Sequence, residues 1–193
     1  MGAHGGFDDS TDEALFFRVA EGDDGAFASF YDRHEAHWYG LVLRIVGDPA
    51  EAEDVLQEGA VLIWERARSF DPDHGRPAAW AATVIRNKAI DRVRARRRRG
   101  EAVARYAEAD GEVEGAPATV SGLGERLEED AAGIVRRTLV SLPAEQRQAI
   151  QMAFFGGLSQ SEIAVQLGLP LGTVKARIRR GMLAMRDALE GVL

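Results

Sequence analysis

Six residues between positions 80 and 98 carry side chains that could act together on a nucleic-acid base. In a helix, at 100° per residue, these six positions fall within about 40° of one line. Aromatic, amide, carboxylate and guanidinium groups stack on, hydrogen-bond to and hold unstacked bases. A solvated basic helix end would give a similar run of charge, so both interpretations stay open. The six residues are Trp80, Val84, Asn87, Asp91, Arg94 and Arg98.

A second basic segment, near the C-terminus, has the pattern of a helix-turn-helix. Ser159 and Glu162 fit a capping box at the start of a short helix. Gly168 suits the turn because glycine tolerates a positive φ, and a second helix from near Thr173 would enter the major groove. The alternative is a helical hairpin with a solvated basic face. The basic residues expected to face outward, opposite Val174 and Ile178, are Lys175, Arg177, Arg179 and Arg180.

A group of acidic residues shares one face of the helix predicted over residues 50–68. Asp54, Glu58 and Glu65 lie on it with Gln57 beside them, and carboxylates could serve acid/base catalysis or metal binding. No convergent histidine or cysteine accompanies them, so a solvated face is the simpler interpretation. His34 and His37 could share a metal, but two histidines without further ligands are more often structural. With no P-loop and no Gly-x-Ser-x-Gly motif, we expect no catalytic residue, cofactor or metal.

Composition narrows the class of protein further. The 193-residue chain has no cysteine, which excludes a disulfide scaffold and a thiolate zinc site. Its net charge is −7, yet residues 84–105 alone hold nine basic and two acidic side chains. This asymmetry suggests nucleic-acid contact by the basic segments and another partner for the acidic remainder. No apolar run approaches the roughly 18 residues that span a bilayer. We therefore expect a soluble, cytoplasmic protein without membrane insertion.

The elements that must position these groups are predicted to be helices. The sequence has no sustained alternation of β-branched residues and no Asn-Gly or Asp-Gly turn, so no strand is expected. Residues 100–124 contain five glycines and little apolar surface, which indicates a flexible acidic linker. The predicted fold class is therefore all-α, with two helical domains joined by that linker. Helices are expected over residues 12–46 (broken at 22–25), 50–68, 77–99, 125–139 and 143–157, followed by the helix-turn-helix.

Three segments, in this order, resemble the sigma-70 family of bacterial RNA polymerase sigma factors, in its small extracytoplasmic-function (ECF) group. Residues 51–58 (EAEDVLQE), with Trp64, resemble the segment that binds the polymerase. Residues 70–80, beginning FDP, and 85–94 (IRNKAIDRVR) resemble the reader of the −10 promoter element. Residues 142–159, beginning LP, and 172–175 (GTVK) resemble region 4, which reads the −35 element.

The resemblance implies a division of the chain and a set of partners. Residues 1–12 would be a disordered tail, 13–99 region 2, 100–124 the linker and 125–193 region 4. The clamp coiled coil of core RNA polymerase would be the docking partner of Asp54, Gln57 and Glu58. The flap region of the polymerase would be a second contact for this protein. Promoter DNA is the second implied partner and an anti-sigma factor the third.

The resemblance also assigns DNA contacts. Val84, Asn87 and Asp91 match positions that line the family's pocket for a flipped base. In the helix-turn-helix, Ala176 stands where serine is common, so a thymine methyl contact could replace a polar one. Arg177 would contact phosphate. The positions that match the family's −35 reader are Lys175, Ala176, Arg179 and Arg180. Ser159, Thr173 and Arg177 complete the set of residues expected at the −35 element.

The same residues are compatible with two other classes of protein. One is a helix-turn-helix regulator that works without polymerase and uses its N-terminal half to sense or dimerise. The other is an RNA-binding or structural adaptor. Binding to core RNA polymerase separates both from a sigma factor.

Overall fold

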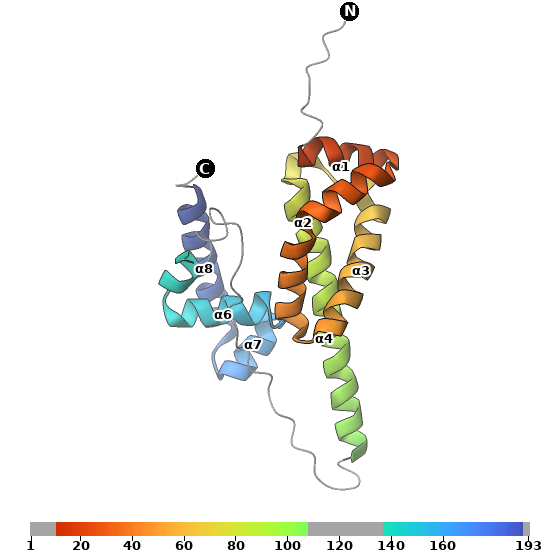
Figure 1. The fold of residues 1–193 in the computed structure, drawn as a ribbon. Helices are drawn as coiled ribbons and strands as arrows, with labels where there is room; N and C mark the ends of the chain where they lie inside the picture. The colour runs from red at the N-terminus through yellow and green to blue at the C-terminus, as the bar shows by residue number, and fades with distance from the viewer. Residues whose placement is uncertain (1–10, 108–136, 191–193) are drawn as a thin grey trace, which may run out of the picture. The chain divides into compact units, whose positions relative to one another are not determined.

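The computed structural model describes residues 11–107 and 137–190, and its regular elements there are all helical (Figure 1). The chain divides into two compact units, Met1–Val113 and Glu114–Leu193. This confirms the predicted all-α fold with two helical domains. The first unit contains α1 (Asp12–Glu21), α2 (Asp24–Val46), α3 (Pro49–Arg66), η1 (Ala67–Ser69), η2 (Pro72–His74) and α4 (Pro77–Ala107). The second contains helical residues 137–141, α6 (Ala144–Phe154), α7 (Gln160–Leu167) and α8 (Leu171–Glu190).

Side-chain caps and glycines set the helix boundaries of the first unit. Asp23 and Asp48 each accept a hydrogen bond from a first-turn amide, at 2.9 and 2.8 Å, and so begin α2 and α3. Gly22 and Gly47 end the preceding helices with positive φ, a conformation that costs glycine little. The break predicted within residues 22–25 and the helix end predicted at residue 46 are confirmed.

The core of the first unit lies where α2 packs against α1, α3 and α4. Its largest fully buried side chains are Trp38, Phe16, Phe30, Ile63 and Ile85. Helices α3 and α4 cross closely at Gly59, where an added Cβ would lie 2.9 Å from Cγ1 of Ile85. This close crossing holds the DNA-facing helix predicted from sequence directly against the acidic helix.

The second unit has a smaller core in two clusters. Leu139, Leu142 and Ile150 form one, and Ile163, Ala164 and Val174 form the other.

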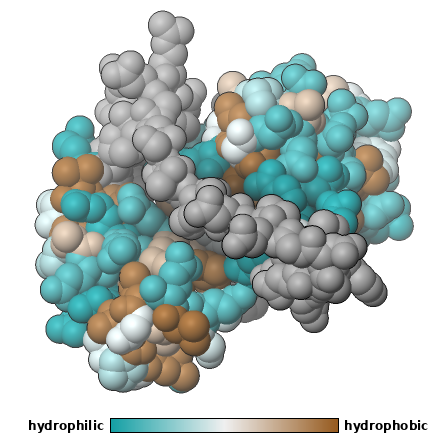
Figure 2. All heavy atoms as spheres, turned by 90° about the horizontal axis from the view of Figure 1, so that it is seen from below, coloured by the Kyte–Doolittle hydropathy of each residue, from teal (hydrophilic) through white to brown (hydrophobic). Residues whose placement is uncertain are grey.

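On the face drawn in Figure 2, hydrophilic residues predominate and hydrophobic residues gather in small groups. None of the helices in the described ranges is long and apolar enough to cross a membrane.

Three predicted boundaries need correction. Asp12 belongs to the helix predicted over residues 12–46 and not to the predicted tail: it begins α1, and its carboxylate binds Arg33 and His34, both at 2.8 Å. Residues 100–107 continue α4 instead of opening the linker, because nothing in their sequence stops a helix whose pattern is already established. Helix α8 begins at Leu171, two residues before Thr173. The rest of the predicted linker and most of the helix predicted over 125–139 lie outside the described residues.

Candidate nucleic-acid interface and docking surface

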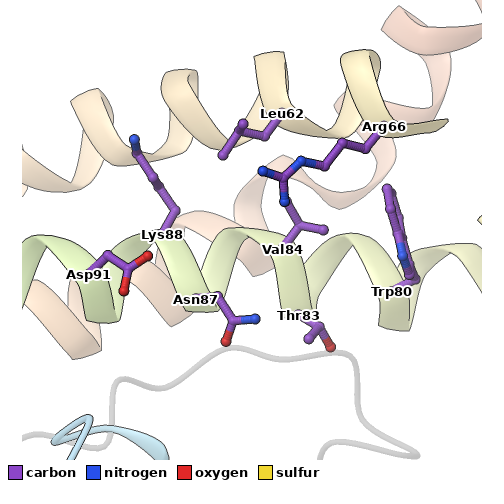
Figure 3. A pocket seen from close by; sticks show the side chains of 8 residues that line it. All are labelled: Leu62, Arg66, Trp80, Thr83, Val84, Asn87, Lys88 and Asp91. Atoms are coloured by element: carbon purple, nitrogen blue, oxygen red, sulfur yellow. The ribbon is translucent and has the colours of Figure 1, made fainter. Parts of the chain in front are cut away.

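Four of the six residues predicted to share a face of α4 line one hollow of about 260 Å³ (Figure 3). Trp80, Val84, Asn87 and Asp91 form its α4 side, together with Thr83 and Lys88. Leu62 and Arg66 reach into it from α3, and the sequence pattern on α4 had not included them. The other two predicted residues, Arg94 and Arg98, lie further along α4 and do not line the hollow.

An aromatic cluster fixes Trp80 at one end of this hollow. The Trp80 ring lies 5.5 Å from that of Phe16 on α1 and 5.8 Å from that of Phe70, both in edge-to-face geometry. Phe16 and Phe70 in turn lie 5.2 Å apart. Such pairs favour tilted over face-to-face arrangements and hold one another in place. Trp80 therefore forms a fixed, half-buried wall.

Ion pairs between α3 and α4 compensate part of the basic run. Glu58 binds Lys88 at 2.6 Å and Arg92 at 2.9 Å, while Glu51 binds Arg96 at 3.0 Å. The hydrogen bond from Lys88, followed by the positive charges of Lys88 and Arg92, lowers the pKa of Glu58. Arg96 also donates a hydrogen bond to the Val46 carbonyl at the end of α2, so its side chain is held against both α2 and α3.

The acidic face of α3 divides into two parts. Asp54 and Gln57 are exposed and have no hydrogen-bond or ion-pair partner among the residues that the structure describes. Glu58, predicted to share their role, is instead bound to α4. Val61 lies one turn beyond Gln57 and is 57% exposed. The signal for Val61 was present in the sequence, since it is an apolar residue that the buried stripe of this helix leaves out.

The helix-turn-helix forms as predicted. The Ser159 hydroxyl accepts from the Glu162 amide at 3.2 Å, and the Glu162 carboxylate accepts from the Ser159 amide at 2.7 Å. This confirms the capping box, and Gly168 has the expected positive φ. Val174 of α8 is fully buried against Ile163 and Ala164 of α7.

One predicted outward-facing residue of α8 points elsewhere. Lys175, Arg179 and Arg180 are exposed, whereas the side chain of Arg177 is only 18% exposed and binds Glu145 of α6 at 2.8 Å. Arg177 is displaced from the predicted set because α6 packs along α8 and offers a carboxylate in its first turn. Thr173 and Ala176 are half-buried.

His34 has a structural explanation. His34 Nε2 lies 2.8 Å from Asp12, and its ring stacks on Trp38 with centroids 5.3 Å apart. In the described part of the chain, no three histidine, aspartate or glutamate side chains gather as metal ligands.

Comparison with known proteins gives two family matches. The model of Sigma-70 region 2 matches residues 30–99, and that of Sigma-70 region 4 matches residues 132–185. The chain is 34% identical over 177 residues to the ECF RNA polymerase sigma factor SigK of Mycolicibacterium vanbaalenii, covering 92% of this chain and 88% of the relative. It is 35% identical over 178 residues to SigK of Mycobacterium bovis, covering 92% and 93%.

Two solved structures are also similar to this chain, at lower identity. Rhodobacter sphaeroides SigE, in complex with the anti-sigma ChrR, is 28% identical with a TM-score of 0.46, covering 93% of this chain and 98% of that one. CnrH, in complex with the cytosolic domain of CnrY, is 26% identical with a TM-score of 0.43, covering 93% and 97%.

Proposed function

This chain belongs to the ECF RNA polymerase sigma factors of the sigma-70 family, and from that premise we propose which residues bind the polymerase and which bind each promoter element. The protein is a transcription initiation factor that binds core RNA polymerase and directs it to promoters by reading −10 and −35 elements. Which side chains perform each step is our proposal. We also propose that it acts in the cytoplasm, without catalysis of its own, and that an anti-sigma factor is a further partner.

In our proposal, the hollow between α3 and α4 receives one unstacked base of the −10 element. The observation that carries this assignment is that Trp80, Val84, Asn87 and Asp91, grouped first by helical spacing, line a single cavity. At about 260 Å³ the cavity is smaller than the pockets typical for drug-sized ligands, as suits a single base. Asn87 and Asp91 can hydrogen-bond a base edge, and Trp80 offers an aromatic edge.

The acidic face of α3 is the proposed docking surface for the clamp coiled coil. Asp54 and Gln57 supply polar contacts there and Val61 an apolar one. Glu58 positions α4 through Lys88 and Arg92 and is not itself free to dock. This assignment explains why an acidic helix can serve a DNA-binding protein: its partner is a protein and not phosphate.

The exposed side of α8 is the proposed reader of the −35 element. Lys175, Arg179 and Arg180 face solvent there, and an arginine can pair with the O6 and N7 atoms of guanine. Thr173 and Ala176 lie on the same helix, half-buried. Ser159 is exposed at the start of α7, where its cap leaves the hydroxyl proton available to a phosphate.

Transcription in vitro tests the −10 assignment. Core polymerase with this protein, run on a genomic promoter library, should select a set of promoters, and permanganate footprinting should show the opened strand. Asn87→Ala should reduce opening about tenfold or more at unchanged closed-complex binding, since it removes a contact to an unstacked base. Ser29→Ala, an exposed polar change on α2, should open promoters normally. Normal opening in Asn87→Ala would remove the assignment.

A further inference from the structure

One cation of the hollow comes from α3 and not from α4. Arg66 is the last residue of α3 and is exposed. Figure 3 shows its guanidinium extending from α3 over Val84. No hydrogen bond or ion pair holds this guanidinium among the residues that the structure describes; the bond from Ser69 goes to the Arg66 backbone carbonyl. The hollow thus contains a positive group without a charge partner.

The cations beside it on α4 are already compensated. Lys88, which also lines the hollow, binds Glu58 at 2.6 Å, and Arg92 binds the same carboxylate at 2.9 Å. Attraction of either cation to DNA phosphate would have to compete with Glu58. Arg66 faces no such competition, so it is the group on this wall best able to hold an anion.

The two ends of the hollow differ in charge. Asp91 lies at one end and Arg66 toward the other, near Trp80 (Figure 3). A phosphate is repelled by the Asp91 carboxylate and attracted by the Arg66 guanidinium, whose planar fork matches phosphate oxygens. A nucleotide would therefore place its base edge toward Asn87 and Asp91 and its phosphate toward Arg66.

Helix electrostatics alone do not account for this placement. A cation in the last turn of a helix is stabilised by the negative end of the helix dipole, which explains a basic residue at position 66. It does not explain why the guanidinium extends over Val84 into the hollow instead of remaining at the carbonyl end of α3.

We propose that Arg66 binds the backbone phosphate adjacent to the base held in the hollow, so that α3 and α4 together grip the single strand. The proposal rests on the proposed function of the hollow and adds to it a phosphate contact and an orientation of the bound nucleotide.

Neutral linkages in the DNA test the proposal on the intact holoenzyme. Fork-junction DNA with a single-stranded −10 element, from a promoter selected as above, is made with one methylphosphonate at each position in turn. In the wild-type holoenzyme, one linkage beside the extruded base should cost about tenfold in affinity, as for loss of a charge-assisted hydrogen bond. In Arg66→Gln, a methylphosphonate at the same position should cause no further loss of affinity. Methylphosphonates at all other positions should reduce the affinity as they do in wild type.

Two further variants complete the test. Arg66→Lys should restore part of the sensitivity at that linkage, because it keeps the charge without the fork. Arg33→Gln, on α2 and outside the hollow, should keep the wild-type profile. Arg66→Gln should also reduce the slope of log K against log salt concentration by about 0.7 in magnitude.

An unchanged linkage profile in Arg66→Gln overturns the proposal. If Asn87→Ala nevertheless loses its base preference at the −10 element, the hollow still holds a base and only the role of Arg66 is wrong. If Asn87→Ala keeps that preference as well, the proposed function of the hollow is what fails.

Discussion

Each unit of this protein carries a basic helix, and the two helices differ in how their charge is compensated. On α4, Lys88, Arg92 and Arg96 all bind carboxylates of α3, at 2.6–3.0 Å. On α8, exposed basic side chains at positions 175, 179 and 180 have no carboxylate partner among the described residues. Arg177, in contrast, crosses from α8 to α6, where it binds Glu145.

The difference corresponds to two kinds of DNA target. A duplex groove is bordered by closely spaced phosphates. Each uncompensated cation on α8 can therefore add to the binding affinity by contacting a phosphate. A single extruded base is chosen by hydrogen bonds and stacking, and excess charge beside the hollow would hold any strand equally well. Glu58 compensates Lys88 and Arg92, so Arg66 is left to hold phosphate at the hollow. Base selection is left to Asn87, Asp91 and Trp80. Breaking either arrangement should affect one promoter element and spare the other.

The largest effect should come from separating α3 and α4. In Gly59→Val the new Cβ would lie 2.9 Å from Cγ1 of Ile85, and overpacking of this kind costs about 1–3 kcal/mol. We expect a lower urea midpoint by tryptophan fluorescence, which reports the first unit because Trp38, Trp64 and Trp80 all lie there. Strand opening should be lost while −35 duplex binding persists.

Gly40→Val on α2 is the matched control for this change. Gly40 has open space where the Cβ would go, so this variant carries the same change in helix propensity without the clash. Equal destabilisation by the two variants would show that the α3–α4 crossing is not the cause.

The next largest effect should be a change in −35 preference in Arg180→Ala. Loss of a base-reading arginine costs about 1–3 kcal/mol and relaxes selection at particular positions. Arg177→Ala should instead weaken all sequences alike, and by less, because its guanidinium holds α8 to α6. Glu145→Gln should then reproduce Arg177→Ala. Binding selection on randomised −35 sequences measures all three, and a wild-type preference in Arg180→Ala would exclude base reading by that residue.

Helix positions could be predicted from this sequence because their signals are local. Proline, aspartate caps and glycines stand at the helix ends, and the apolar spacing identifies Val174 as an inward residue. The end of α4 could not be predicted in the same way. Residues 100–107 have a composition that suits either a helix or a linker, and in the structure they continue the preceding helix.

The grouping of side chains was predictable where one helix carries them and not where two helices meet. The face of α4 followed from periodicity alone. The pairing of Glu58 with Lys88 and Arg92, the position of Arg66 over Val84 and the contact of Arg177 with Glu145 all join residues far apart in the sequence. Such contacts depend on how helices pack, which no single-helix pattern contains.

A smaller effect is expected from the docking surface. Asp54→Ala combined with Gln57→Ala should reduce affinity for core polymerase about tenfold at unchanged helicity, because both side chains are exposed and off the apolar stripe. Asp32→Ala combined with Ser29→Ala removes a similar exposed pair from α2 and should bind core normally. Core affinity equal to wild type in the Asp54 and Gln57 variant would exclude this surface.

The smallest effect should be the pH dependence that Glu58 gives to the first unit. Its pKa in the folded protein is lowered by Lys88 and Arg92, so the folded state favours the ionised form. The stabilisation is complete above the ordinary glutamate pKa of about 4.3 and is lost as the pH falls through the lower folded value. Because the Glu58 side chain is 45% exposed, solvent screening keeps each pair below about 1 kcal/mol.

Glu58→Gln should therefore be slightly less stable than wild type at pH 7 and equally stable below the folded pKa, where both side chains are neutral. Urea unfolding followed by tryptophan fluorescence measures this difference in the first unit. Glu53→Gln, exposed on the same helix without an ion pair, should show no such convergence. At pH 7, Glu58→Gln should also release Lys88 and Arg92 and raise the affinity for single strands of any sequence. A stability gap between wild type and Glu58→Gln that stays constant from pH 7 to below the folded pKa would show that the ion pairs do not stabilise α4 on α3. The contrast between the two basic helices would then have to rest on the hollow alone.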